Sequence, residues 1–373
     1  MGPLDGFKII EIAGIGPGQF AGMLLADMGA SLIRVERPFD TEVGFTIDPR
    51  FDILNRSRPA IGVDLKTKQG VELVLDLCED ADAIFEGFRP GVMERLGLGP
   101  EECMQRNPGL VYGRMTGWGQ DGPLAETVGH DPNYVALAGV YGAIGEKGGD
   151  PVYPLNLVGD MGGGGTYLVM GILAALLETG KSGKGQVIDA AMVDGAASLM
   201  TMMHGFLAAG VWKEGRGCNI LDGGAPFARS YRTKDDKHIV IAPIERRFFK
   251  VLLKKLEIDD FDLADQHDKS KWNELQSLFE AVFKTRTRDE WCELLEGTDA
   301  CFTPILGISE AMEHPHMKAR GTFVSVGGVK QAAPAPRFSR TPSEIRTAAG
   351  HVEPDARQVL EQWGASGKVL RRY

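Results

Sequence analysis

The feature that most limits how this chain can fold is a run of four glycines, residues 162–165, followed by an apolar run at residues 167–177. Glycines remove side chains and let the backbone approach another group closely, so the run predicts a tight turn. The apolar run is too short, and too closely bounded by Glu178, to span a membrane, and it predicts a buried helix. Asp160 would then lie just before a helix N-terminus, near free N–H groups and the positive end of the helix dipole.

Asp160 admits two interpretations. An aspartate before a helix most often caps that helix and has no catalytic role. However, His130 offers a second titratable group earlier in the chain, within Gly-His-Asp-Pro at residues 129–132, a break in structure where catalytic groups are often found. An imidazole and a carboxylate on opposite sides of one carbon would remove a proton from one face and return it to the other. A single histidine is more often a surface or packing residue, and this chain has seven, so both interpretations stay open, with Glu245 as a partner that would orient His130.

Composition limits the setting of the chain. A length of 373 residues is enough for a large core and two domains. Five scattered cysteines without a C-x-x-C pair predict neither a disulfide framework nor a metal site. No signal peptide or lipidation motif opens the sequence, which predicts a reducing, cytoplasmic location. The net charge of −10 argues against nucleic acid or an anionic membrane as the main partner.

Basic residues are nevertheless crowded into one segment, residues 34–68. A solvated surface patch is the simpler explanation. The alternative is a pocket for a small, highly anionic ligand such as a phosphorylated cofactor, because arginine forks match phosphate oxygens. The residues concerned are Arg34, Arg37, Arg50, Arg56, Arg58, Lys66 and Lys68.

Short apolar runs alternate with helical patterns through the first part of the chain. This alternation predicts an α/β fold in which a parallel sheet is covered on both faces. The predicted strands are residues 7–12, 31–35, 61–64, 83–88, 110–116 and 186–190. The predicted helices, including those later in the chain, are residues 19–28, 67–81, 100–105, 193–209, 248–256, 272–283 and 354–363.

The pattern changes after residue 210. Residues 211–226 have no clear period and predict a linker. Two strand-like runs then flank a Lys-Asp-Asp turn and predict a hairpin. We therefore predict a smaller α+β domain at residues 227–320 and a C-terminal segment, 321–373, that returns to a large domain of residues 1–210.

A glycine turn near the N-terminus offers a competing function. Residues 16–21 fit G-x-G-x-x-A, and Glu36 follows near the end of the next predicted strand, which approaches the dinucleotide-binding fingerprint. Pro17 within the turn, and the arginines on both sides of Glu36, argue against an NAD site. A tight strand-to-helix turn is the simpler explanation, because it requires only the conformational freedom of glycine.

Methionines gather near the end of the predicted helix at residues 193–209. A flexible, polarizable surface of this kind suits a variable acyl chain. An ordinary apolar core is the simpler explanation. The residues concerned are Met192, Met200, Met202 and Met203.

Six motifs distributed along the chain are more specific than any of these features. They are Gly-Trp-Gly-Gln at 117–120, Gly-His-Asp at 129–131, Asn-Leu-Val-Gly-Asp at 156–160, Asp-Ala-Ala-Met-Val-Asp-Gly at 189–195, Asp-Gly-Gly-Ala-Pro-Phe at 222–227 and Pro-Ala-Pro-Arg-Phe-Ser-Arg at 334–340. With them the chain resembles, nearly from end to end, the α-methylacyl-CoA racemases of the family III CoA-transferase superfamily. The resemblance implies a Rossmann-like large domain that binds coenzyme A without NAD, and two subunits interlocked like links of a chain.

The resemblance also assigns residues by position. His130 and Asp160 match the two acid/base residues of these racemases. Glu245 matches a glutamate that supports the histidine, and in an interlocked homodimer with shared active sites the partner subunit would supply it. Arg37 matches an arginine that contacts phosphate. The other matched contacts with coenzyme A are Asp64, Leu65, Lys66, Thr67, Gly87, Phe88, Arg89, Arg95, Gly129, Asp131, Asn133 and Tyr134.

The implied reaction interconverts (2R)- and (2S)-2-methylacyl-CoA thioesters by 1,1-proton transfer through an enolate. A thioester carbonyl delocalises poorly onto sulfur, so its α-proton is more acidic than that of an ester, and N–H groups at the glycine-rich helix start would stabilise the charge on oxygen. Coenzyme A is part of the substrate, and no cofactor is expected. Two alternatives stay open: a CoA-transferase with Asp160 as nucleophile, and a non-catalytic CoA-binding protein.

Two departures from the family pattern concern the acyl side of the substrate. After the motif that ends at residue 227 the family commonly has tyrosine, and this chain has Ala228 and Arg229. After the position of Glu245 the family commonly has Pro-Gln, and this chain has Arg246 and Arg247. The three arginines would suit a carboxylate on the acyl group. The simpler explanation is that they face solvent or pair with acids of the nearby hairpin turn.

Overall fold

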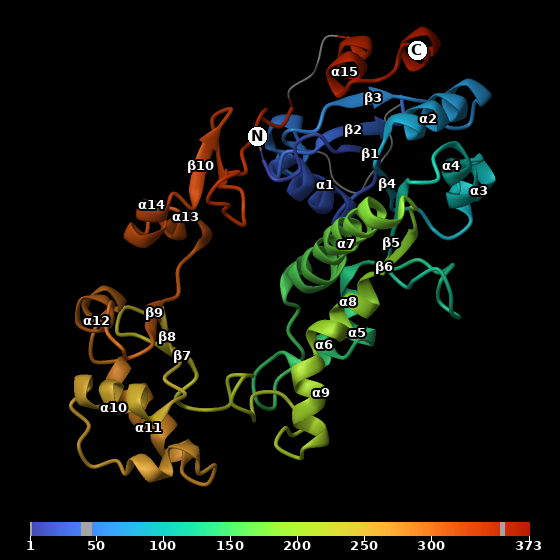
Figure 1. The fold of residues 1–373 in the computed structure, drawn as a ribbon. Coiled ribbons are helices and arrows are strands. Elements are labelled where there is room, and N and C mark those ends of the chain that lie inside the picture. The colour runs from blue at the N-terminus through green and yellow to red at the C-terminus, as the bar shows by residue number, and fades with distance from the viewer. Residues whose placement is uncertain (1, 39–46, 351–354) are drawn as a thin grey trace. The chain divides into compact units, whose positions relative to one another are not determined.

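The computed structural model describes residues 2–38, 47–350 and 355–373. Contacts between residues divide the chain into two compact units (Figure 1). The large unit consists of Met1–Ala138, Pro154–Met200 and Arg320–Tyr373, and the small unit consists of Gly139–Tyr153 and Thr201–Ala319. Two separate segments of the chain therefore make the small unit, and three make the large one.

A six-stranded parallel sheet organises the large unit, in the order β3-β2-β1-β4-β5-β6. This is the strand order of Rossmann-type folds, so the predicted Rossmann-like parallel sheet is confirmed. In the β1–β2 register, Ile10 lies opposite Ile33. The strands are β1 (Lys8–Ile12), β2 (Ser31–Glu36), β3 (Ala60–Gly62), β4 (Ala83–Glu86), β5 (Val111–Thr116) and β6 (Val187–Ala191).

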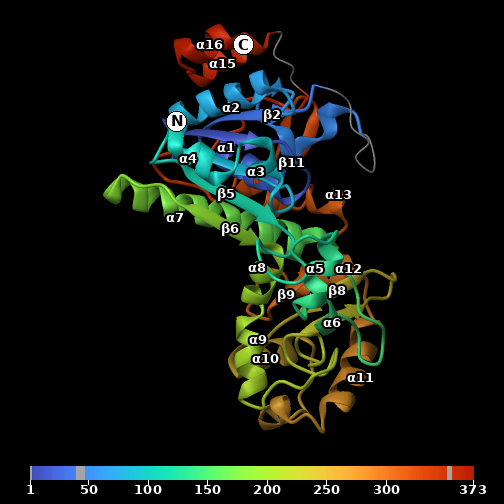
Figure 2. The ribbon, with the colours of Figure 1, turned by 90° about the vertical axis from the view of Figure 1, so that its right-hand side faces the viewer.

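Helices cover both faces of this sheet, as Figures 1 and 2 show for α2 and α7. Ile10 and Ile33 pack on one face with α2, α3, α4, α15 and α16, whereas Ile9 and Leu32 pack on the other with α1 and α7. Neighbouring residues of a strand point to opposite faces, which explains this division. The helices are α1 (Pro17–Asp27), α2 (Lys68–Asp80), α3 (Val92–Leu96), α4 (Pro100–Arg106), α5 (Asp131–Leu137), α7 (Thr166–Ser182), α8 (Met192–Leu199), α15 (Ala356–Trp363) and α16 (Gly367–Arg372), with short 3-10 turns η1 (Pro49–Phe51) and η2 (Ile53–Asn55). Of the predicted final helix at residues 354–363, residue 354 lies outside the described residues.

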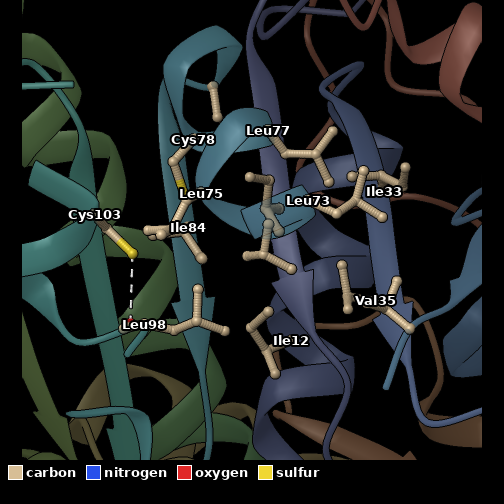
Figure 3. Close-up of a cluster of buried hydrophobic side chains, with 14 of the residues drawn as sticks. Ile12, Ile33, Val35, Leu73, Leu75, Leu77, Cys78, Ile84, Leu98 and Cys103 are labelled. Carbon is tan, nitrogen blue, oxygen red and sulfur yellow. Dashed lines mark hydrogen bonds between the residues drawn. The ribbon is translucent and has the colours of Figure 1, made fainter. Parts of the chain in front are cut away.

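The core between the sheet and α2 is shown in Figure 3. Leu73 and Leu77 of α2 are one helical turn apart and both are buried in this cluster. Cys78 and Cys103 are buried in the same cluster, and the Cys103 thiol donates a hydrogen bond to the Leu98 carbonyl oxygen at 3.4 Å. All five cysteines, each of which the structure describes, are free thiols.

The stretch that contains Asp160 is helical throughout. A 3-10 turn, η3 (Leu155–Leu157), leads into the π-helical segment η4 (Val158–Gly165), which continues directly into α7. Asp160 therefore lies inside a helix, and the predicted turn and N-cap position are both wrong. The continuous 28 residues Leu155–Ser182 are long and apolar enough to cross a membrane by length and composition alone. Leu168 and Ile172 of α7 are nonetheless buried against the sheet.

The glycine run makes room for neighbouring helices. A Cβ atom added at Gly163 would lie 2.7 Å from the backbone nitrogen of Ala196 on α8, and one added at Gly165 would lie 2.7 Å from the carbonyl oxygen of Pro17 on α1. Real Cβ atoms do not approach other atoms so closely, so only glycine fits. Glycine in a helix costs about 1 kcal/mol relative to alanine, and here the close packing of η4 against α1 and α8 offsets that cost.

The small unit is built on an antiparallel sheet, β7-β8-β9, and an aromatic core. The predicted hairpin is confirmed by the β7–β8 pairing. Phe227, Phe249 and Phe279 are fully buried. The elements are β7 (Arg229–Arg232), β8 (His238–Ile241), β9 (Phe302–Pro304), α6 (Val140–Ala143), α9 (Thr201–Ala208), α10 (Arg246–Lys255), η5 (Leu263–His267), α11 (Trp272–Phe283), α12 (Arg288–Leu295), α13 (Ile308–Ala311) and α14 (Pro315–Arg320); the hairpin β10 (Phe323–Val326) and β11 (Val329–Ala332) belongs to the large unit.

The units differ from the predicted domains at residues 139–153. These residues belong to the small unit, because the Arg216 guanidinium donates to the carbonyl oxygens of Gly149, at 2.7 Å, and Gly142, at 3.2 Å. The predicted helix at residues 193–209 is also interrupted. It divides at Met200 into α8 in the large unit and α9 in the small unit.

Residues 211–226 are not a linker but an ordered part of the small unit. The Asp222 carboxylate closes a loop by accepting the N–H groups of Cys218, Asn219 and Gly224 at 2.8 to 3.1 Å. A Cβ atom at Gly224 would lie 2.5 Å from the Cys218 nitrogen, so the loop requires glycine there. The Asp-Gly-Gly motif at residues 222–224 thus has a structural explanation.

Candidate active site

A cavity of about 230 Å³, the first cavity, lies at the carboxyl ends of β1, β4 and β5. This edge of an open α/β sheet, at the point where the strand order reverses, is the usual ligand site of the fold. The glycine turn at residues 14–18 and the loop at residues 87–90 form part of its wall. His130 and Asp160 both line it, so the structure brings together the two residues predicted to move protons.

Two groups lie against one oxygen of the Asp160 carboxylate. Asn156 donates a hydrogen bond of 3.1 Å to Oδ2. Gly16, at φ +66°, lies against the same oxygen, where a Cβ atom would be only 3.2 Å away. Burial raises the pKa of Asp160, and the negative charge of Asp131 raises it further, against the Asn156 hydrogen bond. A raised pKa suits a carboxyl group that takes up and releases a proton near neutral pH.

His130 is the N-cap residue of α5, and its side chain is exposed. Its backbone N–H donates to the Asn133 side-chain oxygen at 3.0 Å. Asn133 therefore orients the backbone of His130, and its predicted contact with coenzyme A stays a prediction. The positive charge of His130 acts to lower the pKa of Asp160, against the larger effect of burial, which raises it.

Asp131 and Tyr134 fix the backbone around the proton-transfer pair. The buried Asp131 carboxylate accepts the N–H of Asp160 at 2.6 Å. The Tyr134 hydroxyl donates to the Gly129 carbonyl oxygen, and its ring packs edge-on against Trp118 at 4.7 Å. Burial raises the pKa of Tyr134 to about 12, so the phenol stays a donor. Gly129 and Tyr134 line the first cavity. Asp131 is not among its lining residues and acts through its hydrogen bond to the Asp160 backbone.

A second cavity, of about 780 Å³, adjoins the first at the ends of β1 and β2 and shares Ile12, Phe88 and Arg89 with it. Gly87 lines the first cavity. The Thr67 hydroxyl caps α2 by accepting the Gly70 N–H at 3.1 Å, and its predicted contact with coenzyme A stays a prediction. The predicted coenzyme A contacts that line the second cavity are Arg37, Asp64, Leu65, Lys66, Phe88, Arg89 and Arg95.

The basic segment at residues 34–68 is not one ligand patch. Arg56 pairs with Asp27 at 2.5 Å and Arg58 pairs with Glu11, and all four side chains are buried. Gly22 leaves the space for the second pair, since a Cβ atom there would lie 2.5 Å from the Glu11 carboxylate. Arg34 pairs with Glu36 and Arg50 with Asp48. Arg37 and Lys66 remain at the second cavity.

The pairing of Arg34 with Glu36 also argues against the interpretation of the glycine turn as a dinucleotide-binding site. The Arg34 Nε donates to Glu36 at 2.6 Å, so this acid is occupied by its own strand. The turn at residues 14–18 lines the first cavity beside Asp160. Gly16 of this turn allows the close approach to that carboxylate.

Glu86, which the sequence analysis missed, lies at the boundary of the site. It ends β4, lines the first cavity and is 1% exposed. Its carboxylate accepts the Phe88 N–H at 2.6 Å and the Arg114 Nε at 3.1 Å, while Arg114 also binds Glu94 at 2.7 Å. Burial raises the pKa of Glu86 to about 7. The sequence signal that could have identified Glu86 is an acidic residue at the end of an otherwise apolar strand.

Glu245 belongs to the small unit, where it is the exposed N-cap residue of α10. Its support of His130 from a partner subunit stays a prediction. Arg247 stacks on the Phe248 ring at 4.3 Å, and the hairpin acid Asp236 pairs with Arg232 at 3.3 Å.

The methionine group is divided between the units. Met192 is buried and lines the first cavity. Met200 follows α8 in the large unit, whereas Met202 and Met203 lie on α9 in the small unit. Met192 is thus placed to contact a ligand of the first cavity.

The Rossmann-like sheet thus carries, at the carboxyl ends of its strands, one cavity with a histidine–aspartate pair and an adjoining cavity lined by cationic side chains. Residues 4–355 match CoA-transferase family III, and the chain belongs to that family. It is 44% identical to α-methylacyl-CoA racemase of Mus musculus over 91% of this chain and 87% of that protein. It is 41% identical to the Homo sapiens protein of the same name over the same shares. Among solved structures, a CaiB/BaiF family protein from Brucella suis superimposes with a TM-score of 0.81 at 27% identity, covering 97% of this chain and 99% of that one.

Proposed function

We propose that this chain racemises 2-methylacyl-CoA thioesters by 1,1-proton transfer, the activity that the names of its mouse and human relatives state. The observation that carries the proposal is that His130 and Asp160 line one cavity. The adjoining second cavity offers Arg37, Lys66 and Arg89, whose positive charges suit the phosphates of coenzyme A.

His130 and Asp160 have complementary roles in the proposed proton transfer. One group removes the α-proton, and the other returns a proton to the opposite face, so that the 2-methyl centre is inverted. The His130 side chain is exposed to solvent. Asp160, whose pKa is raised by burial, holds a proton closer to neutral pH than an ordinary aspartate does.

The enolate oxygen requires hydrogen-bond donors. The N–H of Asp160 is already donated to Asp131, which removes it from the donors expected at the glycine-rich segment. The first turn of α5 does not replace it, because the Asn133 N–H donates to the His130 carbonyl oxygen at 2.8 Å and Pro132 has no N–H.

The test is deuterium incorporation at the α-carbon of a 2-methylacyl-CoA in D₂O. We expect His130→Ala and Asp160→Ala each to slow exchange by about 10²- to 10⁴-fold, the usual contribution of a positioned acid or base. His316→Ala, at an exposed histidine of the small unit, serves as the control and keeps the wild-type rate. Wild-type exchange in both cavity variants would remove the pair from the mechanism.

The family membership supports one alternative, CoA transfer between carboxylic acids. Asp160 would then attack the acyl thioester and carry an anhydride and afterwards a CoA thioester. Incubation with acyl-CoA and an acceptor acid, followed by hydroxylamine, distinguishes the two reactions. A hydroxamate on Asp160 supports transfer, whereas unmodified Asp160 with full α-proton exchange supports racemisation.

We further propose an interlocked homodimer in which Glu245 of one subunit supports His130 of the other. Large apolar side chains remain exposed on α7, where Met170 is 57% and Leu177 is 71% exposed, and on α9, where Met202 is 50% exposed; such surfaces mark protein interfaces. Co-expression of His130→Ala and Glu245→Ala chains tests the arrangement. In a shared site, the hybrid dimer keeps one intact pair and recovers activity, whereas sites made within one subunit leave the hybrid inactive.

The proposed reaction needs no metal or redox cofactor, because coenzyme A is part of the substrate. A rate unchanged by dialysis against a chelator is the expected result. A reducing cytoplasmic location suits the five free thiols, and fractionation of cells that produce the tagged protein checks it.

A further inference from the structure

The small unit contains a cavity of its own, of about 740 Å³, that the proposed proton transfer does not use. We call it the basic cavity. Four cationic side chains line it together with two acidic ones. The cations are Lys147, Lys213, Arg229 and Lys269, and the acids are Glu146 and Asp222.

One of the two acids is already occupied. Asp222 accepts backbone N–H groups with both carboxylate oxygens and also the Asn219 side-chain amide at 2.9 Å. The Asp222 carboxylate therefore already has hydrogen-bond donors from the loop at residues 217–224, which it closes. The cations of the cavity consequently exceed the acid available to them, which favours an anionic occupant.

Arg229 is the residue that most clearly lacks a partner. Its Nε is buried and has no hydrogen-bond acceptor in the small unit, all of which the structure describes. Its guanidinium lies 5.8 Å from the centre of the Tyr231 ring. A buried, unsatisfied donor on a charged group is costly, and an oxyanion is the ligand that a guanidinium fork matches.

The floor of the cavity is rigid. The Trp272 indole is buried, and its N–H donates to the Gln266 carbonyl oxygen at 3.1 Å. The Lys269 ammonium lies 5.3 Å above the Trp272 ring and donates to the Cys218 carbonyl oxygen at 3.3 Å. Contacts within the small unit therefore position both the Trp272 ring and the Lys269 ammonium.

We propose that the basic cavity binds a small molecule with two or more anionic oxygens, a dicarboxylate or a phosphate, through the Arg229 fork and the surrounding lysines. Arg247 does not line this cavity, and neither does Arg246, so among the three arginines that depart from the family pattern Arg229 alone belongs to it. The proposal concerns the small unit by itself and stands independently of the racemase reaction.

Calorimetric titration of the full-length protein with succinate and, separately, with inorganic phosphate tests it. We expect saturable binding of at least one anion, and the tighter of the two identifies the chemistry. Arg229→Gln should weaken it about tenfold or more, because a hydrogen bond to a charged group contributes about 1.5 to 3 kcal/mol. Arg247→Gln is the matched control and should bind as the wild type does.

Further variants keep the result decisive. Lys213→Gln changes a second lining residue and should also weaken binding, which covers the case in which Arg229→Gln fails to fold. Arg37→Gln, in the large unit, should leave the affinity unchanged and so excludes binding at the second cavity. No saturable heat with either anion, or equal affinity in the wild type, Arg229→Gln and Lys213→Gln, would overturn the proposal.

Discussion

Arg58 and Arg37 come from one basic segment of the sequence, yet they have opposite roles. Arg58 is buried and paired with Glu11, whereas Arg37 is exposed and lines the second cavity. A buried arginine with its own acid has no charge left for a ligand. An exposed one at a cavity wall contributes little to folding and remains available. A basic residue in the sequence therefore predicts a binding site only where no acidic residue of the same fold forms an ion pair with it.

The largest effect is expected from breaking the buried pair. Arg58→Ala leaves Glu11 buried without its partner, so we expect the free energy of unfolding to fall by about 3 to 5 kcal/mol. Denaturant unfolding measures this loss. At a temperature where the variant is folded, its KM for acyl-CoA should equal that of the wild type. A raised KM with unchanged stability would place Arg58 with the ligand residues.

Glu86 and Arg114 are a buried pair that borders the first cavity, and pH reveals their contribution. The pKa of Glu86 is raised from 4.5 to about 7, so between these values the folded state holds a proton that the unfolded state has lost. Stability should therefore fall as pH rises from 4.5 to 7, by up to about 3 kcal/mol. Glu86→Gln should remove this part of the slope of unfolding free energy against pH. An identical slope in the variant would contradict the assignment.

Arg37→Gln tests the other side of the comparison. We expect KM for acyl-CoA to rise about tenfold, as for loss of one charge-assisted hydrogen bond, with kcat and the unfolding midpoint unchanged. Lys68→Gln is the matched control from the same basic segment, since Lys68 begins α2 and lines neither cavity. Equal changes of KM in both variants would indicate a diffuse charge effect.

The smallest effect is expected when both members of the buried pair are replaced. Glu11→Leu combined with Arg58→Met removes two charges together, and such replacements are often neutral within about 1 kcal/mol. Comparison with Arg58→Ala separates the cost of an orphaned carboxylate from the contribution of the pair. A double variant as unstable as Arg58→Ala would mean that the ion pair itself stabilises the fold.

Local sequence patterns were sufficient to predict the parallel sheet of the large unit. The apolar runs at β1, β2 and β5 and the helices between them follow from hydrophobic period. The motifs around His130 and Asp160 also pointed to the first cavity. The role of the glycine run did not follow, because four glycines locally favour a turn and only contacts with α1 and α8 make a helix the better solution.

The ion pairs were beyond sequence reasoning for a similar reason. Arg56 and Arg58 form ion pairs with acids 29 and 47 residues away in the sequence. No local sequence pattern predicts a pairing over such a separation. The membership of residues 139–153 in the small unit likewise depends on Arg216, 67 residues beyond Gly149. Contacts of this separation are set by the packed fold.

The last helices of the chain have a consequence for synthesis on the ribosome. Trp363 of α15 is buried against the sheet and donates its indole N–H to the Ser31 carbonyl oxygen at 2.9 Å, and Val369 of α16 is buried in the same core. The first strands therefore emerge more than 300 residues before the segment that covers them. During translation the part of this sheet face that α15 and α16 cover stays exposed while the entire small unit is made. The small unit can thus mature first, and completion of the large unit waits for the end of translation.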